Sequence, residues 1–242
     1  MAIEKYWNVQ NADPIKVKNL AEHLNVNERL TKLLVLRGID TYEAAEAFFK
    51  ININQLHDPY LMKDMDKAIQ RIQSAIANDE QIMIYGDYDV DGTTSVAIVF
   101  QYLTKQFPDK KHLFSYYIPH RYKEGYGISI QGVDHAIAHH IKLVIALDCG
   151  IKAVEKIAYA RAHGIDFIVC DHHTPGQVLP EAVAILNPKQ LDCNYPYKEL
   201  SACGIGYKLI TAISIHYGWD AAINDDLLDL VATSIAADIV PV

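Results

Sequence analysis

Residues 81–92 read QIMIYGDYDVDG, and this stretch decides the fold. Its first half, Gln81–Tyr85, is a short apolar run of the kind found in strands buried on both faces of a parallel sheet. Its second half ends that run with three aspartates at alternate positions and then Gly92, which permits a tight exit into a helix. The stretch therefore predicts a strand, an acidic turn and a helix in succession.

The same alternation continues to the end of the chain, with helical periodicity between short apolar runs. The expected strands are Gln81–Tyr85, His112–Ile118, Leu143–Leu147, Asp166–Cys170 and Val183–Leu186. The expected crossover helices are Thr93–Lys105, Ser129–His139, Ala153–His163 and Gly206–His216. This order predicts an α/β fold with a doubly wound, mainly parallel sheet flanked by helices. Ligands of such sheets bind beyond the carboxyl ends of the strands.

The residues before this region have a different pattern. Apolar residues recur at helical spacing in four segments, which are Ile15–Leu24, Glu28–Arg37, Thr41–Phe49 and Asp64–Ala77. No internal repeat, low-complexity tract or long linker separates these segments from the first expected strand. We therefore expect an N-terminal helical segment, residues 1–80, packed on a catalytic domain of residues 81–242.

Composition narrows the class of protein. Of 242 residues, 50% are apolar and 21% are charged, which is typical of a globular chain. No stretch approaches the roughly 18 apolar residues of a membrane span, and the first residues do not resemble a signal peptide. We expect a cytoplasmic protein with reduced thiols, since its cysteines lack C-x-x-C spacing. They are Cys149, Cys170, Cys193 and Cys203.

The net charge of −8 argues, taken alone, against a polyanionic partner. Several carboxylates, however, are concentrated in motifs that would hold divalent cations. Each such ion cancels two negative charges at the place where substrate phosphates would lie. Net charge therefore does not exclude nucleic acid.

Three expected strands end in acidic or imidazole side chains. One such aspartate alone is commonly a helix N-cap. Several carboxylates gathered at one sheet edge would repel one another and require cations. We therefore predict a metal site, and the residues alone nominate Asp87, Asp89, Asp91, Asp148, His172 and His173.

The D-x-D-x-D-G run also matches the opening of an EF-hand calcium loop. The twelfth position of that loop should be glutamate, but it is Ile98 here, and the run comes directly after a strand. Mixed carboxylate and imidazole ligands favour manganese, with magnesium, zinc or iron as alternatives. Two ions that share a carboxylate would suit phosphoester hydrolysis, which is the reaction we predict.

The motifs resemble, in order and spacing, those of the DHH phosphoesterase superfamily: DYDVDG at 87–92, LDCG at 147–150, DHH at 171–173 and IAADIVPV at 235–242. Residues 117–129 and 185–209 resemble its RecJ branch, the bacterial 5′→3′ exonucleases of single-stranded DNA. RecJ proteins continue into a DHH-associated domain and an oligonucleotide-binding fold. Neither is present in this sequence, so we expect a catalytic core whose own activity is in question.

The resemblance implies two ions, Mn²⁺ or Mg²⁺, bridged by Asp148. The remaining ligands would be Asp87 and Asp89 for one ion, and Asp91, His172 and Asp238 for the other. His173 would lie against the scissile phosphate as a donor or general acid, beside Asp148 and Asp91 in the catalytic group. Asp171 would orient the neighbouring histidine. Without the resemblance, Asp238 is a lone acid for which a helix-end or salt-bridge role is the default.

The resemblance also implies a substrate path. Arg121 is the candidate phosphate contact and Tyr126 a candidate base-stacking platform, although a solvated turn is the usual structure of such a stretch. Gly204 and Gly206 open a helix, where they could present amides to phosphate or allow close helix packing. The implied partners are single-stranded DNA, a single-strand-binding protein and a RecQ-type helicase, in recombination and repair.

Three alternatives remain at this point. Nano-RNases and cyclic-dinucleotide phosphodiesterases have nearly the same core, but their first motif usually begins H-x-x-x-D-x-D, and Tyr85 stands in place of that histidine. Metal-free relatives act as replication scaffolds, but such proteins lose ligands that are all present here. An inactive fragment that still binds metal is the third reading.

Overall fold

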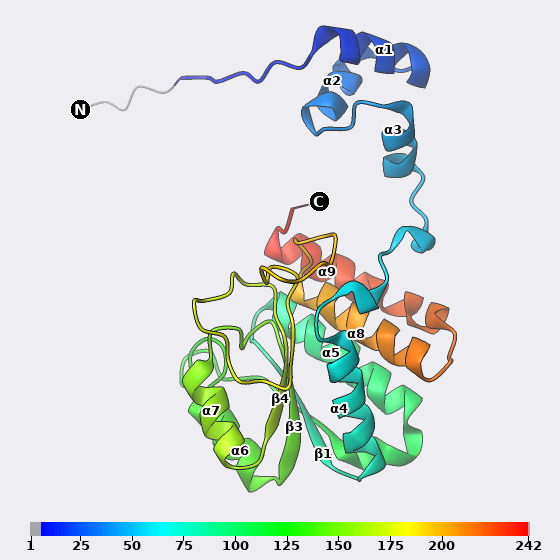
Figure 1. Ribbon diagram of the computed structural model, residues 1–242. Coiled ribbons are helices and arrows are strands. Elements are labelled where there is room, and N and C mark those ends of the chain that lie inside the picture. Colours follow the sequence, from blue (N-terminus) through cyan, green and yellow to red (C-terminus); the bar gives the residue numbers. More distant parts are fainter. Residues whose placement is uncertain (1–5, 242) are drawn as a thin grey trace, which may run out of the picture. The chain divides into compact units, whose positions relative to one another are not determined.

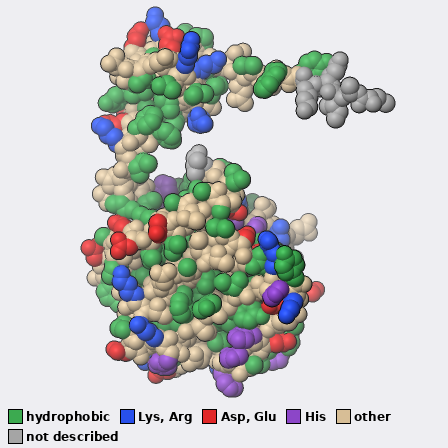
Figure 2. All heavy atoms as spheres, turned by 180° about the vertical axis from the view of Figure 1, so that it is seen from behind, with side chains coloured by type: hydrophobic (Ala, Val, Ile, Leu, Met, Phe, Trp, Pro, Cys, Tyr) green, Lys and Arg blue, Asp and Glu red, His purple; other side chains and the backbone are tan. Residues whose placement is uncertain are grey.

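The structure is a computed structural model that describes residues 6–241, and its chain divides into two compact units. The first, Met1–Leu56, contains α1 (Pro14–Leu24), α2 (Glu28–Leu36), α3 (Tyr42–Phe49) and the short 3-10 helix η1 (Ile53–Gln55). Leu20, Leu34 and Ala45 form its small core. Several larger apolar side chains of this unit stay exposed (Figure 2).

The second unit, His57–Val242, is built on a five-stranded sheet in which every pair is parallel. Its strands are β1 (Gln81–Gly86), β2 (Phe114–Tyr117), β3 (Ile141–Leu147), β4 (Asp166–Cys170) and β5 (Ala184–Leu186). Their order across the sheet is β2-β1-β3-β4-β5. The chain therefore reverses its direction of travel between β1 and β3, which makes this pair the topological switch point.

Helices cover both faces of the sheet (Figure 1). One face carries α4 (Met65–Ala77), α5 (Val90–Gln106), α8 (Ala202–His216) and α9 (Leu228–Asp238), and the other carries α6 (Ile130–Ala138) and α7 (Val154–Ala162). Alternate residues of one strand enter the two cores: Ile84 packs with the first layer and Tyr85 with the second. The remaining 3-10 helices are η2 (Pro59–Leu61), η3 (Pro108–Leu113) and η4 (Ala221–Leu227).

The predicted fold class, a parallel sheet flanked by helices and preceded by a helical segment, is confirmed. β2 is shorter than expected because Pro108–Leu113 forms a 3-10 helix before it. α8 begins earlier than expected because the Ser201 side chain caps it at the amide of Gly204. α9 was not expected at all.

The boundary between the two units does not coincide with the change of sequence pattern near residue 80. It falls after Leu56, so α4 belongs to the second unit, where Met65, Ile69 and Ile72 are buried in the core. The four cysteines are buried and unpaired. Within residues 6–241, no helix is long and apolar enough to cross a membrane.

Candidate metal centre

The predicted acidic residues lie at the switch point of the sheet. Asp87 comes directly after β1, and Asp148 comes directly after β3, its neighbour in the sheet. His172 and His173 lie just beyond β4, the next strand across. The crevice at such a switch point is where open α/β sheets bind ligands.

The turn from β1 into α5 brings two carboxylates inward. Asp87 is fully buried, and neither of its carboxylate oxygens has a hydrogen-bond partner among the described residues. Burial raises its pKa, which the nearby amides of Tyr88 and Gly127 offset only in part. Asp89 is the N-cap of α5 and accepts the Gly92 amide at 2.9 Å through one oxygen, which leaves the other available.

Only glycine fits at position 92, because the backbone of this turn lies very close to Asp87. A Cβ atom there would lie 2.4 Å from the carbonyl oxygen of Asp87, inside any real contact distance. The glycine anticipated as a tight exit into the helix therefore lets the backbone of α5 approach the end of β1.

Asp148 occupies a strained backbone position. Its φ of 62° lies in the left-handed region, which is uncommon for residues other than glycine and recurs at functional sites. Its side chain is buried, and that burial, with the nearby carboxylates of Asp91 and Asp89, raises its pKa to about 10. A bound cation would oppose both effects by favouring the ionised carboxylate.

Asp91 contacts both the first turn of α8 and the candidate metal centre. Its oxygens accept the amides of Ala202 at 2.8 Å and Cys203 at 2.9 Å, so it holds the first turn of α8. The Oδ1 atom also accepts the Ser234 hydroxyl at 2.7 Å. The Oδ2 atom faces the Nε2 atom of His172 at 3.6 Å, so this oxygen points into the centre.

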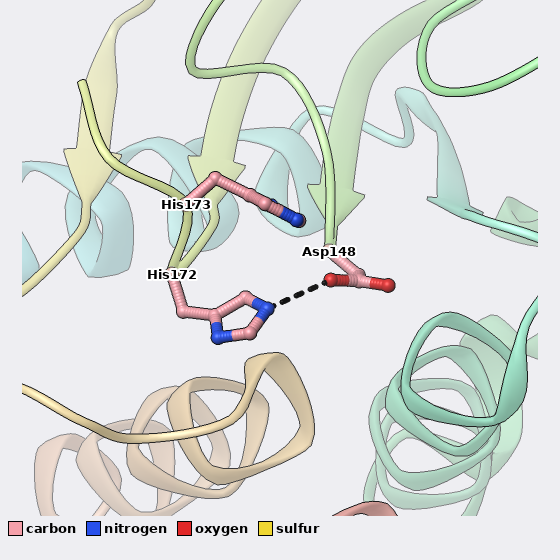
Figure 3. A group of neighbouring side chains, drawn as sticks. All are labelled: Asp148, His172 and His173. Atoms are coloured by element: carbon pink, nitrogen blue, oxygen red, sulfur yellow. Dashed lines mark ion pairs between the residues drawn. The ribbon is translucent and has the colours of Figure 1, made fainter. Parts of the chain in front are cut away.

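His172 points its ring at several carboxylates, as Figure 3 shows for Asp148. Its Nε2 atom lies 3.2 Å from Asp148 Oδ1 and 3.6 Å from Asp238 Oδ2. This atom is buried and has no hydrogen bond of ordinary geometry among the described residues. A ring nitrogen and carboxylate oxygens that face one another unpartnered are the chemistry of a cation site.

The ligand atoms form three groups, in each of which they lie within 4.8 Å of one another. The groups are Asp87, Asp89 and Asp148; Asp91, His172 and Asp238; and Asp148, His172 and His173. All the residues predicted as metal ligands are thus brought together from separate elements. Asp148 belongs to two of these groups and His172 to two, so the three groups adjoin one another.

His173 is oriented by Asp171. One oxygen of Asp171 lies 2.7 Å from His173 Nδ1, and the other accepts the amide of Ile151 at 2.9 Å. Burial acts to raise the pKa of Asp171, but the contact with the His173 ring and the amides of Ile151 and His173 outweigh it, so the pKa lies below its usual value. The same contact raises the pKa of His173. Its Nε2 atom is left facing the Tyr126 hydroxyl at 3.0 Å.

The predicted substrate residues divide into two sets. The Arg121 guanidinium lies 4.5 Å from the ring centre of Tyr88, and the edge of that ring packs on Tyr126, which is 54% exposed. Gly204 and Gly206 instead lie buried in α8. The Gly204 amide is bound to Ser201, and Gly206 faces α5, an arrangement that favours close helix packing over phosphate contact.

Sequence reasoning missed two kinds of residue around the centre. Lys152 and Lys156 line a cavity with Tyr126 and His173, but neither belongs to a motif of the sequence. Ser234 stands one helical turn before Asp238, in a segment that had not been assigned to a helix. Its spacing of four from Asp238 was the available signal.

Fold and ligand set together define a parallel α/β domain with a candidate two-ion centre at its switch point. Residues 81–235 match the model of the DHH family, N-terminal domain. The chain therefore belongs to the DHH family.

Within this family the chain is similar to RecJ. The single-stranded-DNA-specific exonuclease RecJ of Bacillus subtilis is 41% identical over 241 residues, which cover 100% of this chain and 29% of the relative. The protein of the same name from Escherichia coli is 36% identical, over 74% of this chain and 32% of the relative. The chain thus spans about a third of the length of these relatives.

Solved structures agree on the fold. A crystal structure of exonuclease RecJ bound to manganese has 28% identity and a TM-score of 0.65, covering 74% of this chain and 44% of that chain. RecJ of Thermus thermophilus in complex with Mn²⁺ superposes with a TM-score of 0.76 over 97% of this chain and 32% of that chain, at 22% identity. A structure of the Thermus protein with Mg²⁺ also matches.

Proposed function

We propose that this domain hydrolyses phosphodiester bonds with two bound divalent ions, Mn²⁺ or Mg²⁺, and acts as an exonuclease on single-stranded DNA. One observation carries the proposal: two groups of ligand atoms share Asp148, and their buried Asp87 and His172 atoms lack partners. The first ion would be held by Asp87, Asp89 and Asp148, and the second by Asp91, His172, Asp238 and the shared Asp148.

The bound ions would activate water and neutralise charge on the phosphate oxygens. The side chains supply the remaining functions. His173, whose Nδ1 atom is held by Asp171, presents Nε2 beside the centre and donates to the departing oxygen. Asp171 keeps that ring in one orientation and stays outside the ion positions.

Single-strand preference is supported by the exposed ring of Tyr126 next to His173. Tyr126 can stack on an unpaired base, which a duplex hides, and Arg121, which lies over the half-buried ring of Tyr88, adds a charge for phosphate. The names of the relatives point to the same substrate. Digestion from the 5′ end rests on the RecJ resemblance.

The test uses the 242-residue chain with Mn²⁺. Single strands labelled at the 5′ or 3′ end, duplex DNA, short RNA and a cyclic dinucleotide are compared as substrates. We expect mononucleotides from the 5′ ends of single strands, and a loss of at least about 10³-fold in rate for Asp148→Asn. Asp109→Asn, which removes an exposed carboxylate from η3, is the matched control.

Three results would contradict the proposal. If a cyclic dinucleotide or short RNA were cleaved faster than single-stranded DNA, the chain would be a cyclic-dinucleotide phosphodiesterase or a nano-RNase instead. Equal rates for Asp148→Asn and wild type would remove the ion centre from the mechanism. Binding of single strands and Mn²⁺ without any cleavage would favour a binding role for this chain.

A further inference from the structure

Helix α9 packs along α5 and carries Asp238 on its last turn, where no side chain is fully buried. Ser234 is the one fully buried residue of this helix, whereas the Asp238 side chain is 32% exposed. The apolar contacts of α9 with the core come from its first turn, at Leu228, Leu230 and Val231. Ser234 and Asp238 are four residues apart, so they lie on the same face.

Ser234 ties this face to the centre through two contacts. Its hydroxyl oxygen lies 2.7 Å from Asp91 Oδ1 and 2.7 Å from the Ser201 hydroxyl. An ionised carboxylate can only accept, so the single Ser234 proton goes to Asp91. Ser201 then donates its own proton to Ser234, while its oxygen accepts the Gly204 amide.

The resulting chain of hydrogen bonds joins three elements. It runs from the first turn of α8 through Ser201 and Ser234 to Asp91, whose Oδ2 atom faces His172. A buried hydrogen bond to a charged acceptor is among the stronger polar contacts in proteins. It fixes α9 against the same carboxylate that, with His172 and Asp238, forms one ligand group.

We propose that Ser234 is a positioning residue for the second ion. Its hydroxyl holds α9 to Asp91 and thereby places Asp238 within reach of His172, at 3.6 Å. The inference rests on the proposed two-ion chemistry and deepens it. The other ion position, at Asp87, Asp89 and Asp148, uses no residue of α9 and should not depend on Ser234.

The experiment is a calorimetric titration of the 242-residue chain with Mn²⁺ and no nucleic acid. Wild type should bind two ions. In Ser234→Ala, one ion should bind about 10- to 100-fold more weakly, as is usual when a group that orients a ligand is removed, and the other within about threefold of wild type. Thr233→Ala is the matched control, because Thr233 is an exposed neighbour whose hydroxyl bonds only within α9.

Two further variants separate positioning from general loosening. Ser234→Cys fills the buried space but is a weak hydrogen-bond donor. The variant should therefore keep the fold and still bind one of the two ions more weakly. Ser234→Ala should reduce Mn²⁺ affinity less in an Asp238→Asn background than in wild type. The ligand that Ser234 positions is already absent from that background.

Unchanged binding of both ions in Ser234→Ala, or equal weakening of both in a folded Ser234→Cys, overturns the inference. A wild-type chain that binds fewer than two ions overturns the proposed two-ion function as well, and so is distinguishable from failure of the Ser234 inference alone.

Discussion

In the proposed two-ion centre, Asp148 is the residue that both ion positions would share. It is held in the left-handed region at the end of β3, buried, with the carboxylates of Asp89 and Asp91 nearby. Each of these conditions is unfavourable to the metal-free fold. The metal-free chain therefore bears a cost in folding stability at this position, which bound cations would offset.

We expect Asp148→Asn to stabilise the metal-free chain while abolishing ion binding. Asparagine tolerates the left-handed backbone, and it removes a carboxyl group whose raised pKa forces the metal-free chain to take up a proton on folding at neutral pH. In EDTA, urea unfolding monitored by circular dichroism should give a free energy of unfolding about 1–3 kcal/mol above wild type. Mn²⁺ should raise the stability of wild type only. A metal-free variant less stable than wild type would count against this account of the strain.

Lys208 offers a second test at a buried ionisable group, away from the ion centre. It is 4% exposed on α8 and donates to the backbone oxygen of His57 at 2.7 Å. Burial lowers its pKa from 10.5 to about 8. Between these values the unfolded chain binds more protons than the native one, so this group makes stability rise with pH.

Lys208→Met should remove that pH dependence. We expect the methionine variant to gain most over wild type below pH 8, where the native ammonium is buried at a cost. Its advantage should shrink by on the order of 2 kcal/mol as the pH approaches about 10. Denaturant titrations of both proteins at about pH 7 and about pH 10 measure this difference in the free energy of unfolding. A difference that does not change with pH would show that the native lysine is not desolvated.

At the level of strands and helices, the centre results from where each element ends. Strand ends are predictable because buried parallel strands give continuous apolar runs, so the sequence alone places Asp87, Asp148 and His172 at the strand ends where the structure has them. Asp238 is not predictable in this way, because α9 carries a single fully buried side chain and its apolar pattern is weak. Its place depends on the tertiary contact of Ser234 with Asp91, which no local pattern encodes.

The turn between β1 and α5 gives the sharpest prediction for an element. Gly92→Ala would place a methyl group 2.4 Å from the Asp87 carbonyl oxygen, so the helix must shift away from the strand. We expect a loss of about 1–3 kcal/mol in the free energy of unfolding and weaker Mn²⁺ binding. Gly176→Ala, where the nearest atom is 3.6 Å away, is the control. Equal behaviour of the two variants would mean that the turn is not tightly packed.

The net charge of the whole chain is −8, which by itself would repel a nucleic acid. The proposed nucleic-acid substrate is compatible with this charge because of where the charged residues lie. The centre gathers several carboxylates that two divalent ions would largely neutralise. Around it lie Arg121, over an aromatic ring, and Lys152 and Lys156, on the cavity beside His173. Under the proposed function, attraction for phosphate would depend on these local cations and on the ions.

The division into units can be tested by two truncations. Every residue assigned to the centre lies within His57–Val242, so residues 57–242 should fold and bind Mn²⁺ with the affinity of the full chain. Residues 81–242, cut at the change of sequence pattern, also lose α4.

Loss of α4 should be decisive for the fold. Met65, Ile69 and Ile72 are almost wholly buried, and burying such side chains contributes about 1.5–3 kcal/mol each. Together this approaches the roughly 5–15 kcal/mol by which a whole domain is stable. Thermal unfolding by circular dichroism should therefore show a cooperative transition for residues 57–242 and none for 81–242. A cooperative transition in the shorter chain would make α4 dispensable and place the domain boundary at residue 80.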